Sequence, residues 1–438
     1  MSSYTRRKTP GNTDWFVHDR FGMFIHWGLY SMSARAAWVK KDERMTTEQY
    51  SKYFKYFNPD MYDAKEWARR AKEAGMKYAV MTTRHHEGFS MFDTQYSDYK
   101  CTNTPAGRDL IREYVDAFRA EGLKIGFYYS LLDWYHQDYT LDKYHPQFNI
   151  ADGDAFNEGR DMHRYAEFMR NQVRELLTNY GKIDILWLDF SIPPAANDRP
   201  CWQAKGAEEW EAEELIKLAR SLQPDMIINN RADLEQDIWS PEQYQPMEWV
   251  RHQETGELVT WEACQTLAGT YSWCYRRDEG AWKSPEMLIQ MLINTVSCGG
   301  NLLMNVGPTS RGYLDDHANV ALDVYAKWMK YNGRSIYGCT KAEPEFVAPR
   351  GCRLTQSEDG KRLYVHMMEY PYKFLEIPGF EGKVDYAQFL HDGSELRIRE
   401  VEIGHFSEGL TKREKKLVIL LPLAKPDMIV PVIELFLK

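Results

Sequence analysis

Polar, chemically active side chains stand at the ends of several apolar runs in this sequence. The run that begins at Ile183 is typical of a buried strand, and Asp189 ends it. A carboxylate buried without partners is costly, so Asp189 indicates either a paired structural group or a catalytic one. Other apolar runs end in the same way, at His26, His85, His86, Tyr128 and Arg231.

Two kinds of hydrolysis fit such a set of residues. In metal-assisted hydrolysis the histidines and Asp189 would be ligands, but the sequence has no HxH or HExxH motif. Glycoside hydrolysis needs two carboxylates, one that attacks or activates water and one that protonates the leaving oxygen. Asp189 would be one of them. Candidates for the other lie downstream in segments expected to be loops: Asp237, Glu242, Glu248 and Glu262.

Each strand-end residue also has a purely structural interpretation. His85 and His86 are adjacent, so on a strand they would point to opposite faces, and at least one of them could merely bond to the backbone. Arg231 could be the structural partner of Asp189. A barrel has no structural need for a polar group at every strand end, however, so the whole set indicates a functional site.

Alternating strands and helices are expected to position these residues. The expected strands are 21–26, 77–83, 123–130, 183–189, 225–231 and 301–306. The expected helices are 63–75, 109–121, 159–180, 207–222, 284–298 and 315–332. Asp63 is a plausible N-cap, Gly75 a stop, and Ser284-Pro285 a start signal. Crossover helices of this length imply parallel strands.

This alternation predicts a (β/α)8-like TIM barrel over residues 1–336, with the active groups at the C-terminal ends of its strands. A doubly wound sheet is the alternative, but no GxGxxG motif follows an early strand. The pattern does not place the sixth and seventh strands. After residue 336 the helical period is lost, and short strands are expected at 362–367, 373–377 and 416–422. The tail, 337–438, is therefore predicted to be a small all-β C-terminal β-sandwich domain.

Composition narrows the possible partners. The 438 residues carry a formal net charge of −9 without a basic stripe, so no nucleic acid partner is expected. Aromatic residues make up 14% of the chain, which suits stacking on sugar rings and equally a large core. Seven cysteines without a CxxC pair favour a reducing compartment. The polar start and the lack of a membrane-length apolar run lead us to expect a cytoplasmic protein with no membrane partner.

Five motifs occur in order along the chain. They are Phe21–Gly28 (FGMFIHWG), His85–Phe89 (HHEGF), Tyr128–Ser130 with Asp133-Trp134, Leu186–Asp189 (LWLD), and Gly299–Pro308 (GGNLLMNVGP). Together they resemble the α-L-fucosidases of glycoside hydrolase family 29. The resemblance spans about residues 15–335, and the tail agrees with the C-terminal β-sandwich of that family.

The resemblance implies a role for each matching residue. Asp189 matches the nucleophile. Ser240-Pro241-Glu242 resembles the short motif that carries the acid/base in many bacterial members, and Glu262 is the alternative acid/base. The residues that match sugar-binding positions are His26, Trp38, His85, His86, Tyr128, Trp187 and Arg231. Neither a cofactor nor a metal is implied.

We therefore expect an exo-acting, retaining α-L-fucosidase that acts on fucosylated oligosaccharides or glycoconjugates. A homo-oligomer is compatible with the sequence, which does not determine the oligomeric state. The alternatives are a hydrolase of a related α-L-galactoside, a metal-dependent TIM-barrel hydrolase and a non-catalytic sugar-binding protein. Three residues depart from the family pattern. Ala37 replaces the usual Glu and removes one hydroxyl contact, Glu87 replaces Asp, and Phe190 replaces a common Gly.

Overall fold

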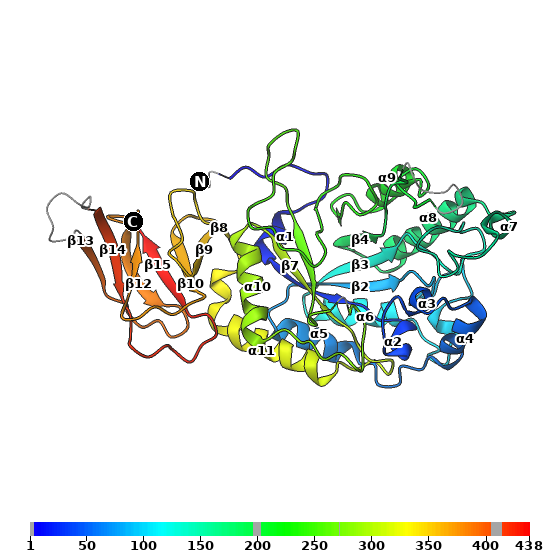
Figure 1. Cartoon of the computed structure of the whole chain (residues 1–438), viewed down its shortest axis with the longest axis horizontal. Coiled ribbons are helices and arrows are strands. Elements are labelled where there is room, and N and C mark those ends of the chain that lie inside the picture. Colours follow the sequence, from blue (N-terminus) through cyan, green and yellow to red (C-terminus); the bar gives the residue numbers. More distant parts are fainter. Residues whose placement is uncertain (1–3, 196–202, 271, 404–413) are drawn as a thin grey trace.

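The computed structural model describes residues 4–195, 203–270, 272–403 and 414–438. Its larger part is built on one parallel sheet with the strand order β5-β4-β3-β2-β1-β7-β6 (Figure 1). The strands are β1 (Phe21–Ile25), β2 (Tyr78–Arg84), β3 (Lys124–Ser130), β4 (Ile185–Asp189), β5 (Ile227–Ile228), β6 (Glu262–Thr266) and β7 (Asn301–Val306). Parallel strands joined by crossover helices confirm the predicted TIM-barrel-like fold.

Local signals set the ends of most long helices. Asp63, Asp109, Ser284 and Asp315 accept backbone N–H bonds at the starts of α5 (Ala64–Glu73), α6 (Leu110–Ala120), α10 (Pro285–Ser297) and α11 (Asp316–Asn332). The other helices are α1 (Asp14–Asp19), α2 (Tyr30–Ser33), α3 (Val39–Asp42), α4 (Thr47–Tyr56), α7 (Gly153–Asn157), α8 (Met162–Asn179) and α9 (Ala212–Leu222), with 3-10 turns η1 (Cys101–Asn103) and η3 (Gly333–Ser335). Helix α9 begins later than expected because residues 207–211 form turns.

An irregular segment, rather than another regular strand, connects the two edge strands β5 and β6. Isolated parallel bridges join Asn229 to Ile238, Trp239 to Trp261 and Glu242 to Cys264. Residues 238–242 therefore run between the two edges of the sheet, and the described chain has no helix between β5 and β6. A regular strand–helix repeat is absent where the sequence pattern fails to place the sixth and seventh strands.

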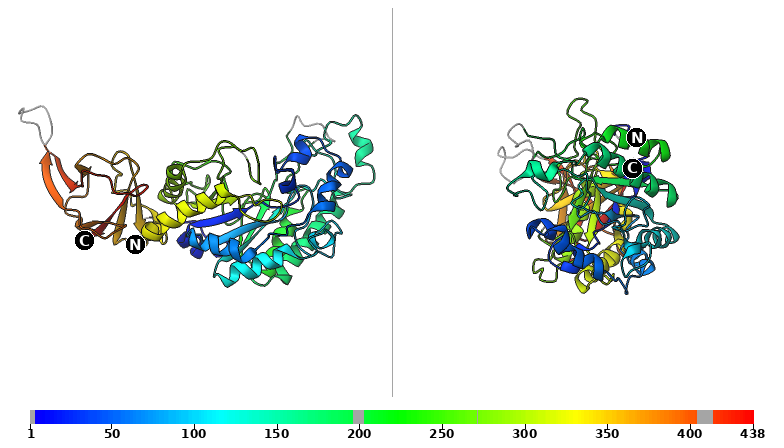
Figure 2. Two further views of the ribbon diagram at one scale, coloured as in Figure 1. Left: turned by 90° about the horizontal axis from the view of Figure 1, so that it is seen from below. Right: turned by 90° about the vertical axis from the view of Figure 1, so that its right-hand side faces the viewer.

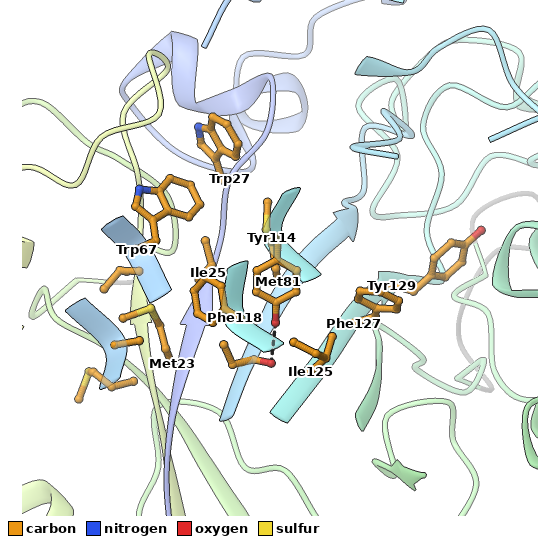
Figure 3. Packing of buried hydrophobic residues seen from close by; sticks show 14 of the residues in the cluster. Met23, Ile25, Trp27, Trp67, Met81, Tyr114, Phe118, Ile125, Phe127 and Tyr129 are labelled. Carbon is orange, nitrogen blue, oxygen red and sulfur yellow. Dashed lines mark hydrogen bonds between the residues drawn. The ribbon is translucent and has the colours of Figure 1, made fainter. Parts of the chain in front are cut away.

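Side chains of the parallel strands alternate between two cores. The inner core of the barrel includes Phe24, Val80, Tyr128, Trp187 and Leu303. The outer core lies under the helices, where Met23, Ile25, Met81, Ile125 and Phe127 pack with Trp67 of α5 and Tyr114 and Phe118 of α6 (Figure 3). The same alternation places Trp187 and Asp189, two positions apart on β4, on the inner face.

The C-terminal strands form two antiparallel sheets at one end of an elongated molecule (Figure 2). One sheet has the order β12-β15-β10-β9-β8 and the other the order β11-β14-β13. The strands are β8 (Cys339–Lys341), β9 (Cys352–Ser357), β10 (Arg362–Met367), β11 (Phe374–Ile377), β12 (Val384–Phe389), β13 (Ile398–Ile403), β14 (Glu414–Leu420) and β15 (Val432–Leu437). Both sheets contribute to one apolar core, which confirms the all-β tail. The domain boundary after residue 336 stays a prediction.

Candidate active site

One pocket at the C-terminal ends of the parallel strands brings together Asp189, Glu242 and the seven residues expected to bind the sugar. Its walls include His26, Trp38, His85, His86, Tyr128, Trp187, Asp189, Arg231 and Glu242. The histidines directly follow strands β1 and β2, Arg231 lies three residues after β5, and Tyr128, Trp187 and Asp189 lie on β3 and β4. Because parallel strands run in one direction, their C-terminal ends meet at one mouth of the barrel.

Asp189 is buried at this mouth of the barrel, with 8% of the residue exposed, and both of its carboxylate oxygens accept hydrogen bonds. The Tyr128 hydroxyl donates to Asp189 Oδ2 at 2.6 Å, and Arg231 Nε donates to Oδ1 at 2.8 Å. His86 Nε2 lies 3.9 Å from Oδ2. These hydrogen bonds from a hydroxyl group and a guanidinium thus offset the cost of burying the carboxylate.

Arg231 joins the two candidate catalytic carboxylates. Its Nη2 atom lies 2.7 Å from Asp189 Oδ1 and 2.8 Å from Glu242 Oε2. Because one nitrogen makes both contacts, these two carboxylate oxygens lie at most about 5.5 Å apart, a bound compatible with a retaining pair and below the separation of an inverting pair. Arg231 is therefore both the ion-pair partner of Asp189 and a residue of the candidate active site.

Glu242 is the more accessible of the two carboxylates, since 35% of its side chain is exposed. Burial raises the pKa of Glu242, the Arg231 guanidinium opposes this shift, and the charge of Asp189 adds to it. A glutamate with a raised pKa holds a proton nearer to neutral pH, as a general acid requires. The isolated bridge to Cys264 fixes the backbone of Glu242 beside β6.

His85 and His86 both face the pocket, contrary to the expectation that they point to opposite faces. Strand β2 ends at Arg84, so the two histidines lie in the following turn and strand alternation does not apply to them. Their ring centroids are 4.0 Å apart. Local chain geometry after the strand end thus presents both imidazoles to one pocket.

Hydrogen bonds assign a tautomer to two of the histidines. Burial lowers the pKa of His26 and of His86, so both rings are neutral at pH 7. The Ser130 hydroxyl donates to a backbone carbonyl, and His86 Nδ1 lies 2.7 Å from Ser130 Oγ, so Nδ1 is the donor. His26 Nδ1 likewise donates to Asn305 Oδ1 at 2.7 Å. Each ring keeps Nε2 as an acceptor for a substrate hydroxyl group.

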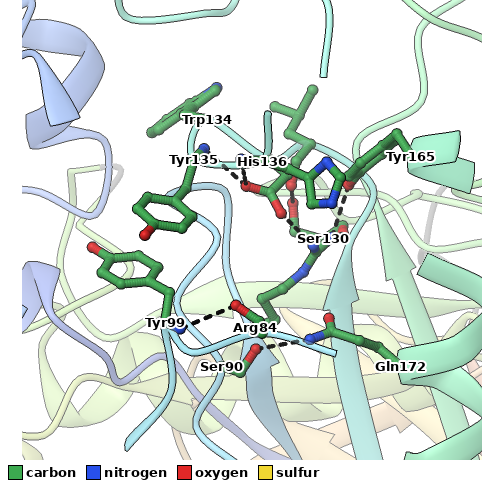
Figure 4. A network of polar contacts seen from close by, with 12 residues as sticks. Arg84, Ser90, Tyr99, Ser130, Trp134, Tyr135, His136, Tyr165 and Gln172 are labelled. Atoms are coloured by element: carbon green, nitrogen blue, oxygen red, sulfur yellow. Dashed lines mark hydrogen bonds and ion pairs between the residues drawn. The ribbon is translucent and has the colours of Figure 1, made fainter. Parts of the chain in front are cut away.

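A buried ion pair supports this end of β2 and β3. Arg84 Nη1 lies 2.5 Å from Asp133 Oδ2, and Arg84 Nη2 donates to the Ser130 carbonyl at 2.7 Å and to the Tyr165 hydroxyl at 2.9 Å (Figure 4). The backbone N–H of Trp134 donates to the His86 carbonyl at 2.8 Å. This network holds the turn that carries His85 and His86 against the end of β3.

Aromatic rings form the walls of the pocket. The Trp187 ring stacks on Tyr128 with 18° between the ring planes, and the Arg231 guanidinium lies 5.1 Å from the Trp187 ring. At the rim, Trp38 packs beside Phe190 with a centroid separation of 5.2 Å. Phe190 has a φ of 76°, which is a left-handed conformation. Glycine adopts this conformation without strain, so a glycine is the residue expected at this position and phenylalanine is strained there.

Sequence reasoning missed three lining residues: Phe24, Cys264 and Trp273. Phe24 could have been found, because it lies two positions before His26 on the expected strand and so shares its face. Trp273 lies in a long irregular segment, and Cys264 lies on β6, which the sequence pattern does not reveal.

The other two residues that depart from the family pattern, Ala37 and Glu87, are both buried. Glu87 Oε2 lies 3.4 Å from His85 Nδ1.

The other carboxylate candidates do not line the pocket. Glu262 begins strand β6 instead of lying in a loop as expected, and its side chain is fully buried inside the barrel. Asp237 accepts the Gly11 N–H at 2.7 Å and pairs with Arg220. Glu248 pairs with Lys341. Geometry therefore favours Glu242 as the partner of Asp189.

Metal-binding clusters and membrane-spanning helices are both absent from the described residues. Within them, no cluster of three or more His, Cys, Asp and Glu side chains is placed to bind a metal ion. None of their helices combines the length and apolar character needed to cross a membrane. Six cysteines are free and buried, and Cys201 lies outside the described part.

Comparison with known proteins gives one consistent family. The family model described as alpha-L-fucosidase matches residues 2–334. Plasma alpha-L-fucosidase of Homo sapiens is 29% identical over 394 residues, which are 82% of this chain and 76% of the relative. The solved structure of alpha-L-fucosidase isoenzyme 1 from Paenibacillus thiaminolyticus has a TM-score of 0.87 and 44% identity, and covers 97% of this chain and 98% of its own.

A further solved structure bears on the reaction. It is a GH29 alpha-L-fucosidase from Bacteroides thetaiotaomicron, trapped as a covalent intermediate with 2-fluoro-fucosyl fluoride. Its TM-score is 0.81 at 27% identity, and the match covers 100% of this chain and 99% of that one. A covalent sugar–enzyme intermediate is the signature of a retaining mechanism.

Proposed function

This chain belongs to the α-L-fucosidase family, and we propose that Asp189 and Glu242 carry the two chemical steps of its reaction. The activity is hydrolysis of α-L-fucosides with retention of anomeric configuration, supported by the covalent intermediate of the Bacteroides relative. The proposed substrate is a terminal α-L-fucosyl group of an oligosaccharide or glycoconjugate, in keeping with the family and with the imidazole and aromatic lining of the pocket.

In the first step, an Asp189 oxygen attacks the anomeric carbon of fucose. The bond from this carbon to the leaving oxygen breaks, and Glu242 transfers its proton to that oxygen. The leaving group departs as an alcohol, and the sugar becomes an ester of Asp189. The hydrogen bonds from Tyr128 and Arg231 hold the Asp189 carboxylate in place before the attack.

In the second step, Glu242 acts as a base. Its carboxylate takes a proton from water, the water oxygen bonds to the anomeric carbon, and the ester bond to Asp189 breaks. Two inversions at the same carbon restore the original configuration. The enzyme returns with Asp189 ionised and Glu242 protonated.

The remaining lining residues hold the sugar. Neutral His26 and His86 accept hydroxyl protons through Nε2, and His85 contributes a third imidazole. The rings of Trp187 and Trp38 pack against apolar faces of the sugar. These roles follow the family resemblance and agree with the position of each side chain in the pocket.

The observation that carries this assignment is the pair of contacts made by Arg231 Nη2. One nitrogen touches both Asp189 and Glu242, so the two carboxylates lie close enough together to act as a retaining pair. Glu262 has no such contact and does not line the pocket; it accepts a hydrogen bond from the indole N–H of Trp187.

Alanine variants separate the two roles. Asp189→Ala should remove nearly all turnover on every α-L-fucoside, whatever the leaving group. Glu242→Ala should lower kcat/KM for a natural disaccharide by roughly 10²–10⁴-fold, but far less for an activated aryl fucoside, whose leaving group needs no proton. Azide needs no deprotonation, so it should restore the second step of Glu242→Ala and give fucosyl azide of retained configuration.

Glu248→Ala is the matched control, because Glu248 is an exposed glutamate of the same connecting segment and lies outside the pocket. It should keep wild-type kinetics. If Glu242→Ala cleaves the disaccharide normally while Glu262→Ala does not, the acid/base assignment is wrong and the nucleophile assignment survives.

A further inference from the structure

Glu262 is a second fully buried carboxylate of the barrel interior, and the proposed mechanism does not use it. Its Oε2 accepts the Tyr78 hydroxyl at 2.5 Å, and its Oε1 accepts the Trp187 indole N–H at 3.2 Å. Tyr78 begins β2, so the carboxyl group lies toward the N-terminal end of the barrel, below the pocket. It therefore contacts the back of the pocket wall and not the sugar.

Such a group is a poor choice for stability alone. Both of its hydrogen-bond partners are uncharged donors, and burial is the largest influence on its ionisation. An apolar side chain of similar volume would fill the same space without the cost of burying a carboxyl group. The feature that an apolar side chain cannot supply is an acceptor for the Trp187 N–H.

The Trp187 indole connects this carboxylate to the groups that hold Asp189. One face of the ring stacks on Tyr128, and the Arg231 guanidinium lies 5.1 Å from the ring centroid. Tyr128 and Arg231 are also the residues that donate hydrogen bonds to Asp189. A tilt of the indole would therefore displace both partners of the nucleophile.

We propose that Glu262 is a positioning residue that fixes the plane of the Trp187 indole and, through it, the placement of Tyr128 and Arg231 around Asp189. The proposal rests on the role assigned above to Asp189. Glu262 exchanges no proton with the substrate. Its effect is to keep the pocket wall and the nucleophile in register.

Two variants test the proposal by kinetics on a disaccharide and on an activated aryl fucoside. Glu262→Gln keeps an acceptor for Trp187 and should retain kcat/KM within about 3-fold, whereas Glu262→Leu removes the acceptor and should lower kcat/KM roughly 10-fold or more. The loss should be equal for good and poor leaving groups, and azide should not relieve it. Equal loss is the mark of misplacement, because a missing proton donor harms mainly poor leaving groups.

Coupling to Trp187 distinguishes positioning from a general structural defect. In a Trp187→Phe background, which lacks the indole N–H, Glu262→Leu should cost little further activity. Losses that simply multiply would overturn the proposal, as would a Glu262→Leu variant with wild-type kcat/KM. A leaving-group-dependent loss that azide relieves would instead make Glu262 the acid/base.

Further measurements keep the outcome decisive. If Glu262→Leu does not fold, folded Trp187→Phe removes the same hydrogen bond from the other side, and wild-type kcat/KM in that variant would overturn the proposal. Glu242→Ala, measured in parallel, reports separately on the proposed function. If it lacks the leaving-group dependence, the acid/base assignment fails while the Glu262 result is still read from its own variants.

Discussion

The change that Glu262→Gln makes to the free energy of unfolding should be more favourable at pH 8 than at pH 4.5. Burial raises the pKa of Glu262 from 4.5 to about 7, against the smaller opposing effect of hydrogen bonds from Tyr78 and Trp187. A raised carboxyl pKa means that the folded protein retains a proton that the unfolded chain has released. The free energy of unfolding therefore falls as the pH rises from 4.5 to 7, and this loss is complete above pH 7.

The size of the effect follows from the shift. Each pKa unit corresponds to about 1.4 kcal/mol, so ionised Glu262 lowers the free energy of unfolding by about 3 kcal/mol above pH 7. Below pH 4.5 the group is protonated in both states and contributes nothing. Glutamine imitates the protonated acid at every pH, so the advantage of Glu262→Gln should grow by about this amount between pH 4.5 and pH 8.

Urea unfolding of both proteins at several pH values measures this difference directly. Other titrating groups are common to both proteins and cancel in the comparison. Glu167→Gln, on an exposed position of α8, controls for the loss of one carboxylate. A Glu262→Gln advantage that is the same at pH 4.5 and pH 8 would show that Glu262 is not buried against uncharged donors, and the reasoning would be refuted.

Three other substitutions follow from the site. Asp133→Ala leaves the Arg84 charge buried without its partner and should destabilise the protein by about 3–5 kcal/mol in urea, whereas loss of the exposed Glu66 should cost much less. Arg231→Ala removes the cation that lowers the pKa of Glu242, so the alkaline limb of its residual kcat/KM should move to higher pH; an unmoved limb would contradict this. Phe190→Gly should raise KM because it removes a side chain from the rim of the pocket, and an unchanged KM would show that Phe190 does not contact the substrate. In the stability of this variant, relief of about 1–2 kcal/mol of left-handed strain should partly offset the lost packing of the ring.

Much of the barrel could be predicted because its signals are local. A capping side chain needs only the next three residues to form its bonds, so Asp63, Asp109 and Ser284 mark helix starts reliably. Strand ends place His26 and Asp189 in one pocket because parallel topology, not detailed packing, decides where those ends meet. Knowing which residues end strands is then enough to collect most of the site.

The rest depends on contacts between distant parts of the chain. Strand β6, with the sequence EACQT, lacks an apolar pattern that would reveal it. Pairing with β7 and bridges to residues 238–242 set its position instead. Glu262 was therefore expected in a loop. Trp273 reaches the pocket from an irregular segment whose path has no periodic signal, and the shared orientation of His85 and His86 depends on where β2 stops.

The identity of the residue that becomes bonded to the sugar is the most direct measurement of the proposed mechanism. Glu242→Gln, treated with 2-fluoro-fucosyl fluoride, should accumulate the intermediate, because fluoride leaves without a proton and the second step lacks its base. Peptide mass spectrometry should then find one added sugar on Asp189 and none in the variant that also carries Asp189→Ala. A sugar attached to any other residue, or a first-formed product of inverted configuration, would contradict the mechanism.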